Sequence, residues 1–252
     1  MSEPITVTTV AEGVARLSWT PRHTLDEVRR EVAAALSEHP RVETLIDPED
    51  QAAQRTAAYS GLHREGVMRG VTVEGRTADR IVYARLVTDA PVNDPGGFRA
   101  LLNSFLPRKR AIGQLLIRDH DDRVLLCRLT YKQDWDLPGG VVEIGESPRV
   151  AVGREVAEEL GLDISPGELV LTDWLPPWGG WDDAICLVFD GGVHDPAILD
   201  TIVKQEREIR DVRFCTPGEV RERAADFTAR RIQAALAGEA PYTESGRGTI
   251  CP

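Results

Sequence analysis

The chain has 252 residues, of which 42% are hydrophobic and 28% charged, and its formal net charge is −11. This length and apolar content suffice for two modest hydrophobic cores and exclude the disordered and fibrous classes. The negative charge argues against a nucleic-acid polymer as a partner, because a long phosphate backbone would be repelled, whereas a small anionic substrate can bind beside a cation.

The N-terminal sequence predicts a cytoplasmic protein without a membrane partner. Residues 1–10 are polar and carry Glu3 where a secretory signal would carry Lys or Arg. No later apolar run approaches the roughly 18 residues that a membrane span requires. Four cysteines lie far apart, without CxxC or Cys/His spacing, which predicts neither disulfides nor a zinc site. They are Cys127, Cys186, Cys215 and Cys251.

The first half alternates strand and helix patterns. Strands are predicted over 5–19, 41–46, 67–73 and 80–87, and helices over 24–39 and 52–60. Pro and Gly punctuation followed by a basic cluster indicates a domain boundary in 89–109. We therefore expect a first α/β domain over 1–95 and a linker over 96–107.

The second half begins with a predicted hairpin around Asp121 and Asp122, followed by a Gly-rich turn and a helix. Strands are predicted over 111–119, 123–130, 169–174, 184–189 and 212–215, and helical sequence over 217–236. This order of strands and helices predicts an α/β sandwich. We assign 108–240 to this domain and 241–252 to a C-terminal tail.

The clearest helix signals lie in the sequence GVVEIGESPRVAVGREVAEELGL, which starts at Gly140. Ser147 is suited to the N-cap, Pro148 to the first turn and Gly161 to the position just past the end. These signals predict a helix over 148–160.

Three glutamates of this helix share one face. Glu155, Glu158 and Glu159 are spaced i, i+3 and i+4, a like-charge arrangement that is mildly unfavourable by itself. A divalent cation would reverse that sign, and magnesium prefers such hard carboxylate oxygens together with substrate phosphates. The alternative for a bare ExxEE pattern is a solvated acidic helix face.

The surrounding residues extend this pattern to a complete motif. Gly140 is followed at fixed spacing by Glu146, by Arg154 and Glu155, by Glu158 and Glu159, and by Gly161. On these residues, the segment 109–237 resembles a Nudix hydrolase domain, and the motif over 140–162 is called the Nudix box, or the box, below. The resemblance implies a loop-helix-loop in an α/β/α sandwich and hydrolysis of a nucleoside diphosphate joined to another group.

The resemblance also implies roles for single residues. Glu155, Glu158 and Glu159 take the metal-ligand positions, with the backbone carbonyl of Gly139, and magnesium is the expected ion with manganese as the alternative. Arg154 takes the position that orients the box glutamates, and Glu146 the one that braces the helix. The general base is either Glu155 or an acid of a later loop. The candidates for that acid, in order, are Glu208, Glu206, Asp182 and Asp183.

The substrate is less visible in the sequence. The stretch DWLPPWGGWDD places Trp178 and Trp181 beyond the box helix, where they could stack a nucleobase or simply pack in a loop. Pro177 lies at a distance from the box that resembles the ADP-ribose-type branch. We therefore favour an ADP-sugar-like substrate. The alternatives are a nucleoside triphosphate pyrophosphohydrolase and a protein that senses a nucleotide without cutting it.

The first half carries a second resemblance. RVETLIDPEDQAAQRTAAYSGLHREGVMRG, from Arg41, followed by DRIVYARLV resembles the distal half of a GNAT acetyltransferase. The loop that should cradle the pyrophosphate of acetyl-CoA reads Thr20-Pro21-Arg22-His23-Thr24, without glycine, and the early strands of that fold are missing. We interpret residues 1–95 as a degenerate GNAT-like module that serves as scaffold, homodimer interface or lid, with residual acetyltransferase activity as the alternative. His23 is interpreted as a surface residue.

Overall fold

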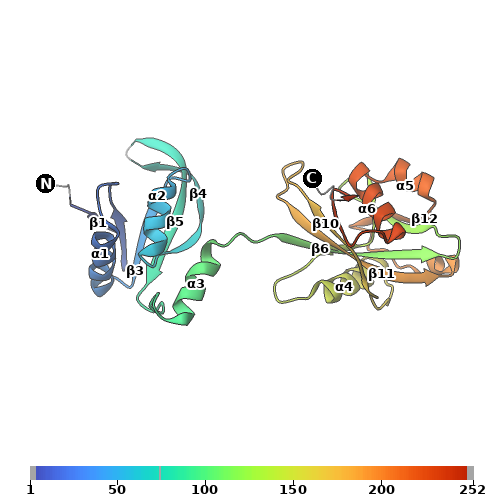
Figure 1. Ribbon diagram of the computed structural model, residues 1–252, viewed down its shortest axis with the longest axis horizontal. Coiled ribbons are helices and arrows are strands. Elements are labelled where there is room, and N and C mark those ends of the chain that lie inside the picture. Colours follow the sequence, from blue (N-terminus) through green and yellow to red (C-terminus); the bar gives the residue numbers. More distant parts are fainter. Residues whose placement is uncertain (1–3, 74, 249–252) are drawn as a thin grey trace. The chain divides into compact units, whose positions relative to one another are not determined.

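The computed structural model describes residues 4–73 and 75–248. The chain divides into two compact units between Pro107 and Arg108, called unit 1 and unit 2 below (Figure 1). Within the described ranges, no helix combines the length and the apolar character needed to cross a membrane.

Unit 1 is a five-stranded sheet with three helices. Its elements are β1 (Thr6–Ala11), β2 (Val14–Ser18), α1 (Leu25–Glu38), β3 (Arg41–Ile46), α2 (Gln51–Tyr59), β4 (His63–Val73), β5 (Arg76–Leu86) and α3 (Pro95–Phe105). The strand order is β1-β2-β3-β5-β4, and only β2 and β3 pair in parallel. One core cluster joins α1 and α2 to the sheet, with Val28 and Val32 of α1 and Ala57 of α2 against Leu17 and Val42.

Two expectations for the first half are wrong. The predicted strand over 5–19 is a hairpin, because Gly13 takes a left-handed turn conformation (φ 72°) between β1 and β2. The predicted linker over 96–107 is largely helix α3. Asp94 caps that helix by accepting hydrogen bonds from the N–H groups of Gly96 (2.7 Å) and Gly97 (3.3 Å), and the two glycines hide the helical pattern in the sequence.

Unit 2 is built on a single mixed sheet. Its elements are β6 (Arg110–Asp119), β7 (Val124–Leu129), β8 (Trp135–Asp136), β9 (Gly139–Val141), α4 (Pro148–Leu160), β10 (Leu169–Leu175), β11 (Ala184–His194), a 3-10 helix η1 (Pro196–Thr201), β12 (Ile209–Cys215), α5 (Pro217–Arg223), α6 (Asp226–Ala237), β13 (Tyr242–Glu244) and β14 (Arg247–Gly248). The strand order is β12-β7-β6-β11-β10-β13-β14, with β8 on β7 and β9 on β6.

Helices cover both faces of this sheet (Figure 1). Val152, Val156 and Leu160 of α4 pack in one core cluster with Leu115 of β6, whereas the neighbouring Leu116 belongs to a second cluster with α5 and α6. Successive residues of a strand point to opposite faces, so β6 separates the two cores. The expected mixed α/β fold with three layers is confirmed for unit 2.

Two further details depart from expectation. The helical sequence over 217–236 is two helices, α5 and α6, which part at Ala224 and Ala225, both extended. The predicted tail over 241–252 contributes β13, which pairs in parallel with β10. Residues 249–252, including Cys251, lie outside the described part of the chain, whereas the other three cysteines are buried thiols.

Candidate active site

Helix α4 begins and ends where its caps predict. Ser147 Oγ accepts a hydrogen bond from the N–H of Val150 (3.4 Å), Pro148 occupies the first turn, and Gly161 ends the helix in a left-handed conformation (φ 67°). The apolar face of the helix packs into the sheet. Its glutamate face lies against β9, where Glu159 contacts Gly139 and Glu155 lies beside Gly140.

Glu159 lies at the centre of this face and is only 5% exposed. Its Oε2 accepts a hydrogen bond from the N–H of Gly139 at 3.2 Å. Burial raises the pKa of Glu159 to about 7; the Gly139 hydrogen bond opposes this rise, and the negative charges of Glu155, Glu208 and Asp136 add to it. Without a cation, this carboxylate is half protonated near neutral pH.

Glu155 sits one helical turn earlier, against the backbone of Gly140. Burial raises the pKa of Glu155, Arg154 partly offsets the rise, and Glu158 and Glu208 increase it. A Cβ atom on Gly140 would approach the Glu155 carboxyl carbon to 2.5 Å. Glycine at this position therefore leaves room for the carboxylate.

Arg154 binds three acidic side chains at once. It makes a bidentate pair with Glu146, from Nε to Oε1 (2.9 Å) and from Nη2 to Oε2 (3.1 Å). It also reaches Glu155 (3.1 Å) and Glu158 (3.0 Å). The Arg154 hydrogen bonds lower the pKa of Glu146, whose Oε2 also accepts from the N–H of Glu143 (3.2 Å). The loop before α4 is thus braced to the helix through one guanidinium.

The four candidate acids of the later loops are not equivalent. Glu208 is exposed in the turn before β12, and its charge raises the pKa of both Glu155 and Glu159. Asp183 instead pairs with Lys109 and accepts a hydrogen bond from Trp174 Nε1 (3.3 Å). The remaining two, Glu206 and Asp182, are exposed. Glu208 is therefore the loop acid that acts on the box electrostatically.

The donor set fits a hard divalent cation. The carboxylates of Glu155, Glu158 and Glu159 and the carbonyl of Gly139 are oxygen groups of the kind such an ion prefers. Burial, and to a smaller extent the neighbouring carboxylates, raises the pKa values of Glu155 and Glu159. In the described residues no three Asp, Glu, His or Cys side chains already converge as a metal cluster. The Glu158 side chain is paired with Arg154 (3.0 Å) and is 56% exposed. Because more than half of this side chain is exposed, a change of rotamer would bring its carboxylate toward an ion.

A buried polar network behind the site was not anticipated from the sequence. Arg231 of α6 is 1% exposed and donates to Asp173 (2.8 Å) and to Gln114 Oε1 (2.9 Å). Gln114 in turn donates from Nε2 to Asp136 (2.9 Å), which pairs with Lys132 (2.6 Å). Because the backbone of Gln114 pairs with Gly139, this network fixes the strand that carries Gly139. No local pattern links residues so far apart in sequence.

Tyr131 is a second residue that the sequence did not single out. Its side chain is 72% exposed, and it precedes β8 by four residues. Partial burial of its hydroxyl raises the pKa of Tyr131, and the charges of Glu159, Asp136, Glu208 and Glu155 raise it further. The Tyr131 hydroxyl therefore lies within electrostatic range of the box glutamates.

The two predicted substrate-binding tryptophans occupy a tight hairpin. Trp178 and Trp181 exchange backbone hydrogen bonds (3.0 and 2.8 Å) across Gly179 (φ 57°) and Gly180 (φ 87°), and both rings are 59% exposed. Trp178 meets Phe227 of α6 edge to face at 5.4 Å, and Arg110 lies 4.7 Å from the Trp181 ring. These are the ring contacts of the pair, and the box glutamates are not among them.

The comparisons agree with this geometry. A family model described as the NUDIX domain matches residues 107–236, and the chain belongs to this family and is a pyrophosphohydrolase. The resemblance inferred from the box is thereby confirmed. Members of the family generally use divalent metal ions.

Individual relatives match part of the chain. A MutT-like protein of Streptomyces ambofaciens is 33% identical over 142 residues, which are 55% of this chain and 83% of that protein. The CTP pyrophosphohydrolase of Escherichia coli K12 is 40% identical over 58 residues, 21% of this chain and 43% of that enzyme. The crystal structure of a MutT protein from Methanosarcina mazei is 23% identical with a TM-score of 0.44, and the match covers 52% of this chain and 97% of that one.

Proposed function

We propose that unit 2 hydrolyses the diphosphate linkage of a nucleoside diphosphate joined to a sugar or similar group, with magnesium as its ion and manganese as a substitute. The observation that carries this proposal is the placing of two carboxylates, the half-buried Glu155 and the buried Glu159, beside the backbone of Gly139 and Gly140, where the charge of Glu155 raises the pKa of Glu159. Such a pair is unfavourable by itself and is stabilised by a bound cation.

Each residue of the box then has a definite task. Glu155, Glu158, Glu159 and the Gly139 carbonyl would hold the ion, which when bound neutralises phosphate charge and lowers the pKa of a water. Arg154 keeps the glutamates in place and links them to Glu146. The proton of the attacking water goes to Glu155 or to Glu208, the loop acid whose charge acts on the box.

A product assay tests the substrate class. The protein is incubated with magnesium and a panel of nucleoside diphosphate sugars and nucleoside triphosphates, and the products are weighed. An ADP-sugar substrate releases AMP and a sugar phosphate. Release of a nucleoside monophosphate and pyrophosphate from triphosphates would favour the second candidate, triphosphate pyrophosphohydrolysis, which the CTP pyrophosphohydrolase among the relatives supports. Tight nucleotide binding without any product would favour a sensor, although sensing does not need all three glutamates.

We propose further that Trp178 or Trp181 stacks the substrate base. Because both rings are 59% exposed, alanine at either position should leave the melting temperature nearly unchanged and raise KM by about 10- to 100-fold, as expected for a stacking energy of about 1–3 kcal/mol. Steady-state kinetics of the two variants and of Tyr131→Ala measures this. Unchanged KM in both tryptophan variants with a raised KM in Tyr131→Ala would move the stacking role to Tyr131.

For unit 1 we propose a degenerate GNAT-like module without acetyl-CoA binding. Its element order supports the resemblance: β2, α1, β3, α2, then Gly61-Leu62 and two strands. The loop before α1 supports the degeneracy, since the N–H of Thr20 bonds to the His23 ring (3.1 Å) and the N–H of Thr24 to the Glu27 carboxylate (2.7 Å). The amides that would cradle a phosphate are already bonded, and an acidic side chain occupies the helix N-terminus.

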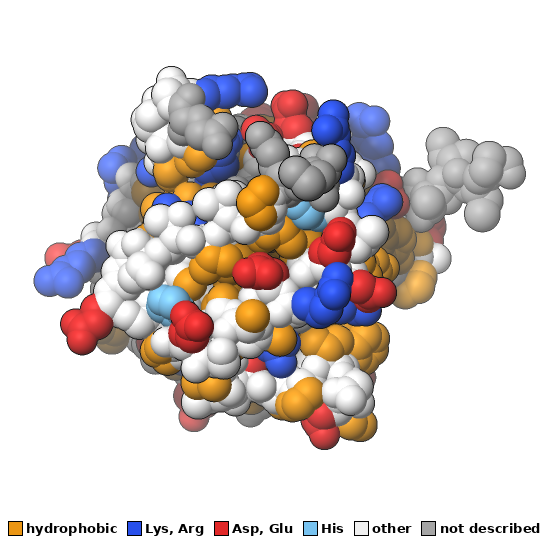
Figure 2. Space-filling view, turned by 90° about the vertical axis from the view of Figure 1, so that its left-hand side faces the viewer, with side chains coloured by type: hydrophobic (Ala, Val, Ile, Leu, Met, Phe, Trp, Pro, Cys, Tyr) orange, Lys and Arg blue, Asp and Glu red, His pale blue; other side chains and the backbone are white. Residues whose placement is uncertain are grey.

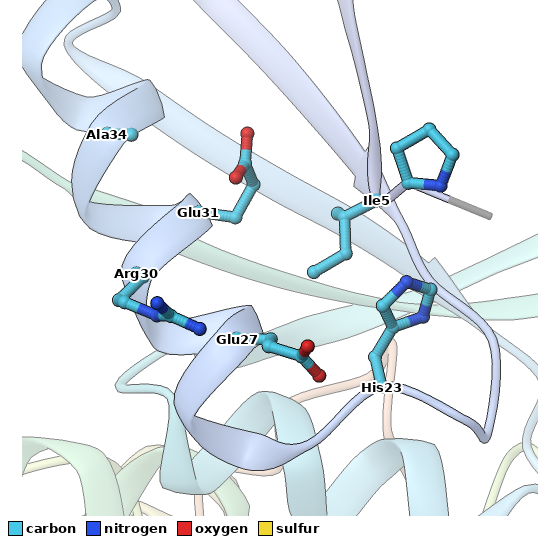
Figure 3. Close-up of a pocket in the computed structure, with 7 residues that line it drawn as sticks. Ile5, His23, Glu27, Arg30, Glu31 and Ala34 are labelled. Atoms are coloured by element: carbon cyan, nitrogen blue, oxygen red, sulfur yellow. The ribbon is translucent and has the colours of Figure 1, made fainter. Parts of the chain in front are cut away.

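The hollow beside this loop has the wrong charge for a pyrophosphate. Its volume is about 520 Å³, and Glu27, Glu31, Arg30 and His23 surround it with Ile5 (Figure 3). The face of unit 1 seen in Figure 2 mixes acidic, basic and hydrophobic side chains.

We therefore expect calorimetry of the full chain with acetyl-CoA to show no binding with a Kd below about 10 μM. Saturable acetyl-CoA binding tighter than this limit would contradict the degenerate interpretation.

A further inference from the structure

A second hollow in unit 1 lies beside α2 and differs in character from the acidic hollow beside α1. Its volume is about 430 Å³, and it lies between α2, the paired strands β4 and β5, and the end of α3. Its principal side chains are Gln54, Arg55 and Tyr59 of α2, Arg64 of β4, Tyr83 of β5 and Phe105 of α3. The α2 residues recur at helical spacing, so one stripe of the helix forms a wall.

The charge of this hollow is uncompensated. Arg55 and Arg64 form no ion pair with any described residue, and no carboxylate is among the side chains that line the hollow. Three other arginines of the same sheet are paired with carboxylates: Arg16 and Arg41 with Glu43, and Arg80 with Asp47. Two guanidiniums left together in a concave site, on a chain of net charge −11, indicate an anionic occupant.

Aromatic rings complete the lining. Tyr59 is 61% exposed and Phe105 is 40% exposed, so each presents ring surface that the protein core does not cover. Tyr83 is buried at 3% exposure directly across the β4–β5 ladder from Arg64. Burial raises the pKa of Tyr83 and Arg64 only partly offsets the rise, so its hydroxyl stays protonated and can donate a hydrogen bond at neutral pH.

The walls are held by hydrogen bonds outside the hollow. The N–H of Arg64 donates to Ser104 Oγ (3.1 Å), which donates to the carbonyl of Leu101 (2.7 Å) and so joins α3 to β4. Gln54 Nε2 donates to the carbonyl of Pro48 (2.8 Å), and Arg29 Nε donates to the carbonyl of Tyr59 (3.0 Å). The cationic and aromatic groups are thus presented on fixed elements.

We propose that this hollow is a binding site for a mononucleotide, separate from the Nudix box. Arg55 and Arg64 would hold the phosphate, with the Tyr83 hydroxyl as a further donor, and Tyr59 and Phe105 would contact the planar base. The volume lies within the range of small-molecule pockets. The proposal does not depend on the reaction assigned to unit 2.

The test is titration of the full chain, in EDTA, with AMP, inorganic phosphate and adenosine. We expect saturable AMP binding that is tighter than that of phosphate or adenosine. Arg64→Gln should weaken AMP binding by about 10-fold or more, as expected for loss of a charge-assisted contact, and Tyr59→Ala should weaken AMP but not phosphate. Arg69→Gln is the matched control, since Arg69 lies on the same strand, is exposed, and does not line the hollow.

Each other outcome counts against the proposal. AMP binding that Arg64→Gln leaves intact would place the ligand elsewhere in the chain. Equal affinity for AMP and phosphate would show that the site does not recognise the base. An equal loss of AMP binding in Arg69→Gln would show that the effect of Arg64→Gln comes from the change in net charge and not from its position in the hollow. Magnesium-dependent hydrolysis should be present in Arg64→Gln, so a failure of the reaction assigned to unit 2 is recognised separately.

Discussion

Replacement of Glu159 by glutamine is expected to lower metal-dependent hydrolysis by roughly a thousandfold or more without destabilising the fold. Glutamine has a similar size and helix propensity, and its side-chain oxygen can still accept the hydrogen bond from the N–H of Gly139. It removes a charge that is 5% exposed and repelled by Glu155, Glu208 and Asp136. Without metal, the variant should therefore melt at the same temperature as the parent at low pH, where Glu159 is protonated, and at a higher temperature near and above pH 7.

The raised pKa of Glu159 should also make the stability of the metal-free protein depend on pH. The pKa of Glu159 is about 7 in the folded chain against an ordinary value of 4.5, so the folded state binds more protons between these values. The free energy of unfolding is therefore highest, as far as Glu159 is concerned, below pH 4.5, where this side chain is protonated in both states. It falls by up to about 3 kcal/mol as the pH rises through 7 and Glu159 becomes charged in the folded state. Melts at several pH values in EDTA should show this decline in the parent and a smaller one in Glu159→Gln.

Magnesium separates the metal site from a merely acidic helix face. Millimolar magnesium should raise the melting temperature of the parent through ligand binding and that of Glu159→Gln much less. Glu168→Gln removes an exposed glutamate of the same unit and should behave as the parent does. Full turnover in Glu159→Gln, or an equal magnesium response in all three proteins, would refute the assignment of Glu159.

Alanine substitutions at the two adjacent glycines should have opposite consequences. At Gly140 the new Cβ meets the Glu155 carboxylate at 2.5 Å, and this flexible group can move away. We expect Gly140→Ala to fold nearly as stably as the parent but to lose roughly a hundredfold in activity, because Glu155 is displaced. At Gly139 (φ 134°) the Cβ would meet the carbonyl oxygen of Gly113 at 2.2 Å, and a paired backbone cannot yield. Gly139→Ala should therefore unfold more easily by about 2–4 kcal/mol.

Urea denaturation together with one hydrolysis assay distinguishes these two outcomes. Gly145→Ala is a useful control: it has a similar left-handed backbone (φ 84°) but open space around the added Cβ, so it measures conformational strain alone. A Gly140→Ala protein with parental activity would show that Glu155 does not need its present position. A parental stability for Gly139→Ala would contradict the tight pairing of β9 with β6.

The box helix and its chemistry could be predicted because their signals are local. The N-cap at Ser147, the turn at Gly161 and the spacing of Glu155 and Glu159 all act within one or two helical turns. Burial also alternates along β2, β10 and most of β11, as a period of two predicts, whereas β6 and β7 are buried almost continuously. The family resemblance implied separate roles for Arg154 and Glu146, and the structure adds that these two side chains pair with each other across eight residues.

Features made by residues distant in sequence appeared only in the tertiary structure. Arg231 and Gln114 are separated by 117 positions, and their contact depends on the register of the sheet and on which face α6 covers. Asp173 is buried because β13 returns beside β10, where Thr243 and Gly246 both donate to its carboxylate (2.8 Å each), so the expected tail became a strand. The charge of Glu208 on the box likewise depends on the turn that carries it. Propensity and capping operate between near neighbours, whereas sheet register and layer packing decide which distant side chains share one buried site.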